Sequence, residues 1–330
     1  MQEPMKERSL RSGDIVEVKS PAEIIDTLDE CGKLDGLPFM PEMLPYCGQR
    51  FVVAKRAEKV CIYSVSRRIL GTVLLGDLRC DGSGHGGCQE ECRLFWKESW
   101  LRRVSPNQAL PAPVDEQARE ALARLVATNT KREVGAGGFP EMRYVCQYTE
   151  LCRASQGLAV WDVRAYLREL TTGNVAIGRF LRVTARAAFE ETLQALGLMS
   201  RIPLRPTRAA PIACQSLGLL PGDWVEVKTK EEIAATLNSA GKNRGLWFDR
   251  EMLPHCGKTY RVRMRVNRLI DYGTGKMIEL SSDCVKLEGV TCSGDLSTGR
   301  WFCPREIFPY WRECWLRRLP APSAKKDDNG

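Results

Sequence analysis

The sequence is poor in histidine and has no long apolar run. Of its 330 residues only two are histidines, His85 and His255, which limits every mechanism that needs an imidazole acid or base. No stretch of 18 or more apolar residues occurs, so no membrane-spanning helix is expected. The first residues are polar and lack the apolar core of a signal peptide, and we therefore expect a cytoplasmic protein.

The common catalytic signatures are also missing from the sequence. It contains no Walker phosphate loop, no G-x-S-x-G, no H-E-x-x-H, and no G-x-G-x-x-G placed after a strand pattern. The glycine-rich run at residues 82–87 precedes a cysteine instead of the Lys-Ser or Lys-Thr pair that binds phosphate. No reaction class can therefore be assigned from motifs, and whether the chain is an enzyme stays open.

Composition is ordinary apart from cysteine. Hydrophobic residues make up 43% and charged residues 27%, which is typical of a soluble globular protein. The net charge of +8 is compatible with an anionic partner such as nucleic acid, although acidic residues are interleaved with the basic ones. The fourteen cysteines are many for a protein without an export signal. In a reducing compartment, closely spaced thiols indicate a metal site or redox chemistry more than structural disulfides.

An internal repeat organises the chain. Residues 13–48 return at residues 222–257 with a constant offset, and about 21 of the 36 aligned positions are identical. A second shared block closes each copy, at residues 95–104 and 310–319. Each copy is then a unit of roughly 90 to 100 residues, the ordinary size of a small domain. The sequence therefore predicts two copies of one fold.

Each copy has the same local signals. A Gly-Asp turn leads into a β-branched strand, and Ser20 or Thr229 then caps a short helix, with a glutamate three residues after the cap. A proline-broken apolar segment follows, where we expect one short helical turn, and then a second strand and a hairpin at residues 67–80 or 275–292. The short strands opening with G-D-x-V-E-V resemble small SH3-like or KOW-type barrels, which implies a barrel shape but no function.

The expected architecture is α+β, with two SH3-like modules separated by a helical domain. Asp115 caps an amphipathic helix, and two further helical patterns cover residues 158–174 and 177–197. The boundaries we predict are a disordered start at 1–12, module 1 at 13–104, a linker at 105–114, the helical domain at 115–200, a linker at 201–221, module 2 at 222–319 and a disordered tail at 320–330.

The densest chemistry lies at the end of the first copy. Three cysteines and a histidine occupy thirteen residues, and glycines between them allow several ligands from one short loop to meet. With the upstream Cys61, these residues form a candidate tetrahedral zinc site. The candidate ligands are Cys61, Cys80, His85, Cys88 and Cys92. The same thiolates are suited to an iron–sulfur cluster, and ordinary buried thiols or a reactive thiol are the other interpretations.

The second copy lacks part of this ligand set. Alignment of the closing blocks pairs Arg300 with His85 and Ile307 with Cys92, while Cys292 and Cys303 correspond to Cys80 and Cys88. We therefore expect one metal in the first copy only, unless Cys284 and an acid complete a second site. The remaining shared pair, Cys47 and Cys256, is expected to be buried, and Cys146 and Cys152 are expected to be core thiols.

The tryptophan pairs Trp96/Trp100 and Trp311/Trp315 are four residues apart, which predicts one face of a closing helix packed on the core. A platform for stacking bases is the alternative.

Two functions are compatible with all these features. The first is a zinc-stabilised, non-catalytic interaction protein that binds a protein or nucleic acid. The second is a redox or biosynthetic enzyme, or its accessory, with an iron–sulfur cluster or reactive cysteine in module 1.

Overall fold

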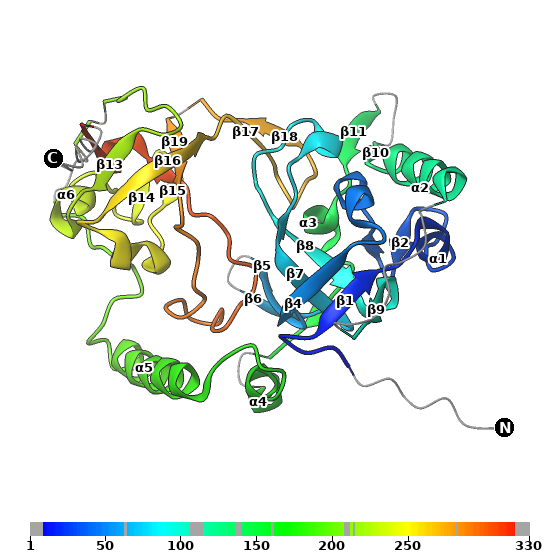
Figure 1. Ribbon diagram of the computed structural model, residues 1–330. Coiled ribbons are helices and arrows are strands. Elements are labelled where there is room, and N and C mark those ends of the chain that lie inside the picture. The colour runs from blue at the N-terminus through cyan, green and yellow to red at the C-terminus, as the bar shows by residue number, and fades with distance from the viewer. Residues whose placement is uncertain are drawn as a thin grey trace, which may run out of the picture. The chain divides into compact units, whose positions relative to one another are not determined.

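Figure 1 shows the computed structural model of the chain. It describes residues 9–62, 65–105, 115–135, 140–159, 162–207, 212–213, 215–281 and 283–320. The chain forms two compact units of mixed α+β structure. The first comprises residues 1–192 with 268–278 and 293–307, and the second comprises 193–267, 279–292 and the remainder. Within the described residues, no helix has both the length and the apolar character needed to cross a bilayer.

A curled, antiparallel five-stranded sheet forms the core of the first unit (Figure 1). In sheet order its strands are β8 (Arg93–Lys97), β7 (Thr72–Arg79), β4 (Arg50–Arg56), β1 (Ile15–Val18) and β9 (Leu101–Arg103). Phe39 packs edge-on against Trp96 and Trp100, with ring centroids 6.1 and 5.2 Å apart. Both tryptophans are fully buried, so they belong to the core, as the simpler of the two interpretations predicts.

A sheet with the same strand order lies in the second unit. Its strands are β20 (Trp311–Arg312), β19 (Cys284–Leu287), β16 (Thr259–Arg265), β13 (Trp224–Val227) and β21 (Leu316–Leu319). The registers are shifted by the repeat offset, since Ile15 faces Val52 in one sheet and Trp224 faces Arg261 in the other. Even the irregularity in β4 after Val53 has its counterpart in β16 after Val262. Similar local sequences thus give the same strand pairing.

The capping predictions are confirmed. Ser20 caps α1 (Pro21–Ile25) and Thr229 caps α6 (Lys230–Ala234), each in a capping box with the glutamate three residues on. The proline-broken segments form the short 3₁₀ helices η1 (Pro41–Tyr46) and η4 (Arg250–His255). A 3₁₀ turn suits them because proline cannot continue a regular helix.

Two local predictions are wrong. The closing block is not a helix, because Trp96 lies in β8 and Trp100 in the 3₁₀ turn η3 (Glu98–Trp100). The expected hairpins are also paired differently: β6 (Val65–Arg68) pairs with the preceding β5 (Lys59–Ile62), whereas β7 crosses to β4. The second repeat shows the same change, with β17 (Arg268–Ile270) beside β18 (Met277–Glu279) and β19 beside β16. Alternation alone does not tell which neighbour a strand will choose.

The region between the repeats has the three predicted helices, α2 (Glu116–Thr128), α4 (Val163–Thr171) and α5 (Ile177–Ala195). Asp115 caps α2 as expected, by accepting a bond from the Gln117 amide. This region also contains the hairpin β10 (Lys131–Val134) and β11 (Glu141–Tyr144), helix α3 (Gln147–Glu150), and β12 (Gln156–Gly157), which pairs with β6. It is therefore not purely helical.

Short elements complete the fold. They are β2 (Lys33–Leu34), β3 (Leu37–Pro38), η2 (Ser83–His85), β14 (Lys242–Asn243), β15 (Leu246–Trp247) and η5 (Glu313–Trp315). Most of the predicted linker at 105–114, most of the start at 1–12 and nearly all of the tail at 320–330 lie outside the described residues, and so does part of the linker at 201–221.

Candidate metal centre

The loop between β7 and β8 folds back on itself around a glycine. Gly82 has a φ of +75°, and a Cβ placed there would lie only 2.1 Å from the Cys88 carbonyl oxygen, so no other residue fits this backbone. The amide of Gly87 donates to the Gly82 carbonyl at 3.0 Å and closes the turn. The loop thereby brings η2 and its final residue, His85, against η1.

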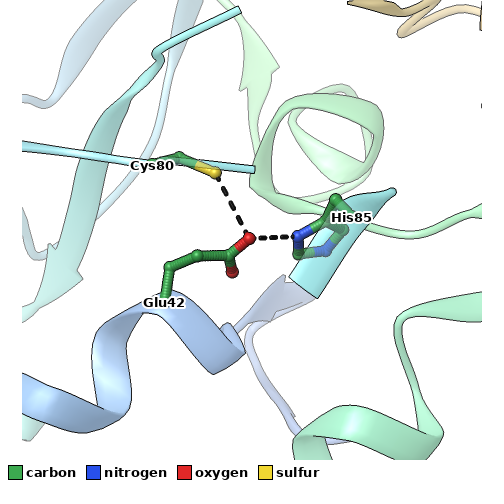
Figure 2. A group of neighbouring side chains, drawn as sticks. All are labelled: Glu42, Cys80 and His85. Carbon is green, nitrogen blue, oxygen red and sulfur yellow. Dashed lines mark hydrogen bonds and ion pairs between the residues drawn. The ribbon is translucent and has the colours of Figure 1, made fainter. Parts of the chain in front are cut away.

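Three potential ligands meet where η1 faces this loop (Figure 2). The Glu42 Oε1 lies 2.7 Å from the Nδ1 of His85 and 3.5 Å from the Sγ of Cys80. The amide of Gly84 also donates to the same oxygen, at 3.1 Å. The three ligand atoms all lie within 4.8 Å of one another, and Glu42 and His85 are buried. Carboxylate oxygen, imidazole nitrogen and thiolate sulfur are each ligands that zinc binds in proteins.

The second ring nitrogen of His85, Nε2, faces a backbone carbonyl, which determines that this nitrogen carries a hydrogen. Nε2 lies 3.0 Å from the carbonyl oxygen of Val145, which can only accept, so Nε2 carries a hydrogen. Nδ1 then faces the Glu42 carboxylate, at 2.7 Å. One proton lies between Nδ1 and the Glu42 carboxylate at this distance, and a bound ion would take the place of that proton. A metal-bound histidine commonly donates its second N–H to a backbone carbonyl in this way.

Burial and charge act in opposite directions on these groups. Burial by itself raises the pKa of the Glu42 carboxyl, but the hydrogen bond and the charge of His85, with smaller contributions from other bonds, lower it below its usual value. For the Cys80 thiol, burial and then the nearby Glu42 charge raise the pKa far above its ordinary range. The metal-free site therefore holds an ionised carboxylate beside a protonated thiol.

A small cavity of about 30 Å³ adjoins this group, and four thiols line it. They are Cys80, Cys88, Cys92 and Cys146. Cys80 and Cys92 follow the β7–β8 pairing of Arg79 with Arg93, and the Cys80 amide donates to the Cys92 carbonyl at 2.8 Å. Directly opposed residues of an antiparallel pair project to the same face of the sheet, so these two thiols are neighbours.

Of the sequence-derived candidates, the structure brings His85, Cys80, Cys88 and Cys92 to one cavity. Cys61 does not line this cavity. It lies in β5, and its Sγ is 3.0 Å from the Sγ of Cys303. The predicted ligands thus divide into two groups, with Cys61 in the second.

Two residues at this site were not predicted from the sequence. Cys146, expected to be a core thiol, is buried but also lines the cavity, whereas Cys152, also expected in the core, is exposed. Glu42 was passed over among 41 acidic residues. Its one available signal was identity between the repeats, since Glu251 occupies the matching position in the second copy.

The second repeat has a different arrangement. Cys284 is buried and its Sγ accepts a bond from Arg312, while Cys292 is half-buried. Cys47 is buried and Cys256 is half-buried. Among the residues that the structure describes, Glu42, Cys80 and His85 are the one group of three ligand atoms this close together.

Comparison with known proteins adds no information about this site. No protein-family model, no curated protein and no solved structure matches the chain.

Proposed function

We propose that the chain is a zinc-stabilised, non-catalytic interaction protein with its metal centre at Glu42, Cys80 and His85. Cys92 is the proposed fourth ligand, because it is the thiol paired with Cys80 across β7 and β8. Three of these ligands, Cys80, His85 and Cys92, come from the loop that the cysteine spacing indicated, and so does the cavity thiol Cys88. Glu42 takes the role that the sequence analysis gave to Cys61.

The observation that carries this proposal is the setting of His85. Its Nε2 is held by the Val145 carbonyl, its Nδ1 lies 2.7 Å from the Glu42 carboxylate, and the Cys80 thiol contacts the same carboxylate oxygen (Figure 2). A buried histidine that merely fills space needs no such convergence of three ligand types. The arrangement resembles a metal site in which a proton occupies the position of the ion.

The size of the cavity favours a single ion. About 30 Å³ is room for roughly two water-sized spheres, which accommodates one ion. An iron–sulfur cluster has several iron and sulfide atoms and prefers four thiolates, so it requires more space and a different ligand set. Zinc tolerates mixed nitrogen, sulfur and oxygen ligands in tetrahedral geometry. We therefore favour zinc over the cluster.

The frame of the protein is, in this proposal, a pair of diverged SH3-like modules. The support is the shared strand order and the constant register offset of the two sheets. A barrel of this kind offers loops and a sheet face to a protein or nucleic-acid partner. If the partner is nucleic acid, retention on a DNA or RNA matrix should fall steeply between low and moderate salt, because counterion release sets the slope.

Metal analysis of protein purified without oxygen tests the proposal. We expect about one zinc per chain and no visible absorbance. Cys80→Ser, His85→Gln, Glu42→Gln and Cys92→Ser should lose most of the zinc, whereas Cys303→Ser, in the corresponding loop of the second repeat, should keep it. Zinc present at a thousand times its dissociation constant stabilises the folded state by about 4 kcal/mol, so a chelator should lower the midpoint of thermal unfolding.

The variants also separate the alternatives. Loss of metal from Cys88→Ser and Cys146→Ser, with metal retained in Glu42→Gln and His85→Gln, would move the ion to an all-thiol site and contradict the proposed ligand set. A brown preparation containing iron and sulfide would favour the cluster and the redox class of function.

A further inference from the structure

A second pair of thiols meets away from the candidate metal centre. Cys61 in β5 and Cys303 in the segment 293–307 are 242 positions apart in sequence, yet their sulfur atoms lie 3.0 Å apart. Both side chains are buried, with 5% and 4% of their surface exposed. Two thiols held this close require little movement to form a disulfide.

Hydrogen bonds join the two segments that carry the thiols, on both sides of the pair. The Lys59 Nζ donates to the Trp301 carbonyl, and the Ser66 hydroxyl donates to the Gly299 carbonyl. Beyond the thiol, the Arg305 guanidinium donates to the carbonyl of Cys61 itself at 2.6 Å. The hairpin β5–β6 therefore holds the segment before and after Cys303.

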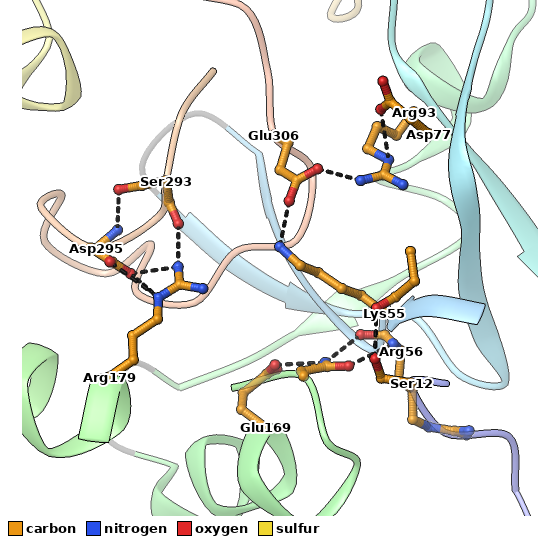
Figure 3. Close-up of polar contacts among 12 residues, drawn as sticks. Ser12, Lys55, Arg56, Asp77, Arg93, Glu169, Arg179, Ser293, Asp295 and Glu306 are labelled. Atoms are coloured by element: carbon orange, nitrogen blue, oxygen red, sulfur yellow. Dashed lines mark hydrogen bonds and ion pairs between the residues drawn. The ribbon is translucent and has the colours of Figure 1, made fainter. Parts of the chain in front are cut away.

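Ion pairs fasten both ends of the same segment (Figure 3). Near its start, the Asp295 carboxylate pairs with Arg179 of α5 at 2.7 Å. Near its end, the Glu306 carboxylate bridges Lys55 of β4 and Arg93 of β8. Because the segment is anchored along its length, the approach of Cys303 to Cys61 belongs to the packed fold and not to a loose loop end.

Positive charge surrounds the pair. Lys59 and Arg305 are both buried and both act electrostatically on Cys61 and Cys303. Burial raises the pKa of the Cys303 thiol, and the neighbouring Cys61 raises it further, while the Arg305 charge opposes this. The cations therefore favour a thiolate that burial disfavours, and the burial makes oxidation of this pair slow.

We propose that Cys61 and Cys303 form a reversible disulfide that locks the segment 293–307 onto the β5–β6 hairpin. This inference is independent of the proposed zinc site. The oxidant is a low-molecular-weight disulfide, for which oxidised glutathione is the probe. One protein thiolate attacks a sulfur of the probe, forms a mixed disulfide and releases one glutathione thiolate.

The second step completes the exchange. The other protein thiol loses its proton, attacks the protein sulfur of the mixed disulfide and displaces the second glutathione. The two protein thiols are thus oxidised to one disulfide while one oxidised glutathione is reduced to two glutathione molecules, which take up the two protons. Reduced glutathione or a dithiol reverses the reaction.

Peptide mapping tests the pair directly. Trypsin releases residues 60–67 and 301–305, and each of these peptides contains a single cysteine. After the folded wild-type chain is equilibrated with oxidised glutathione, the free thiols are alkylated in denaturant and the digest is analysed without reduction. We expect the two peptides to be joined by a disulfide, and dithiothreitol to separate them.

Controls make the result specific. Cys61→Ser and Cys303→Ser should abolish the joined peptide, whereas Cys284→Ser, which removes a buried thiol beside Arg312, should leave it unchanged. Oxidation should also slow proteolysis within 293–307 several-fold in the wild type and not in either serine variant. Alkylated Cys61 and Cys303 in the fully equilibrated wild type would overturn the proposal, and so would glutathione mixed disulfides that never close. The wild-type map decides this even if a variant fails to fold.

Discussion

Two loops of the first unit, residues 82–91 and 294–306, close through the same backbone contacts. Gly82 and Gly294 both have positive φ angles, and an added Cβ at either would press on the backbone of Cys88 or Cys303. The matching bonds run from Gly87 to Gly82 and from Phe302 to Gly294, and from Cys88 to His85 and from Cys303 to Arg300. One loop conformation thus occurs twice, once from each repeat.

The residue facing each loop thiol differs. The Cys88 Sγ accepts a bond from the Ile270 amide at 3.4 Å, whereas the Cys303 Sγ meets the Cys61 Sγ. Ile270 and Cys61 are counterparts at the repeat offset. A second difference is His85 against Arg300, because a guanidinium is always charged and offers no lone pair to a metal. In our two proposals, the same backbone supports a metal site in one loop and a disulfide in the other, and single side chains make the difference.

The largest expected effect concerns Phe302, which has a φ of +61° where the other loop has Gly87. Its ring stacks on Phe180 with centroids 5.4 Å apart, so removing the ring should cost about 3–5 kcal/mol of unfolding free energy. Glycine at this position relieves about 1 kcal/mol of backbone strain. We therefore expect Phe302→Gly to be less destabilising than Phe302→Ala in denaturant unfolding. If Phe302→Ala is instead the less destabilising of the two changes, the positive φ is not a feature of this loop.

The next effect concerns Glu169, whose neighbours include Cys303. Burial raises the pKa of its carboxyl to about 7 from 4.5, against the bond from Asn174 and the charge of Lys59. The folded state thus keeps a proton that the unfolded state releases, and stability falls as pH rises from about 4.5 to about 7. The loss is about 3 kcal/mol for this shift.

Glu169→Gln should remove this pH dependence. The variant should match the wild type near pH 4 and exceed it in stability at pH 8, as measured by denaturant unfolding at both values. Equal pH profiles for the two chains would show that the carboxyl ionises normally beside the second loop.

A thiol placed opposite Cys88 tests whether the two loops are interchangeable. Ile270→Cys should create one additional disulfide under the oxidising conditions used for Cys61 and Cys303, detected by the mass of the alkylated chain. Because Ile270 is buried, the change should cost about 1–2 kcal/mol when reduced. Ile270→Val is the matched control, with a similar or smaller cost and no added disulfide. Failure to cross-link would mean that the loops differ in more than the facing residue.

The smallest expected effect is at Gly87. It has a φ of +72°, and the nearest atom to an added Cβ is the Arg268 Cδ at 3.9 Å, so alanine has room but not a favourable backbone. Gly87→Ala should cost about 1–2 kcal/mol. Gly157→Ala serves as the control, since nothing lies within 4 Å of its added Cβ and its φ is not in this range. An equal, near-zero effect of both changes would contradict the assignment of strain.

The sequence by itself determined the local features and their recurrence. The constant offset of the repeats fixed matching registers, and the caps at Ser20 and Thr229 marked where the short helices begin. The spacing of Cys80, His85, Cys88 and Cys92 also identified the loop whose residues line the cavity. Such features are readable because they depend on neighbours within a few residues, where spacing alone sets geometry.

Only the tertiary structure decided which distant groups meet. Glu42 reaches His85 across 43 positions, and Cys61 reaches Cys303 across 242. The tertiary structure also decided that β6 pairs with β5 and β7 with β4. The alternation of apolar and polar residues is equally compatible with a β6–β7 hairpin. Contacts of this sort depend on which long loops the chain closes and on how whole elements pack. Neither leaves a periodic pattern in the sequence, and so the dithiol and the candidate carboxylate ligand became visible only in the fold.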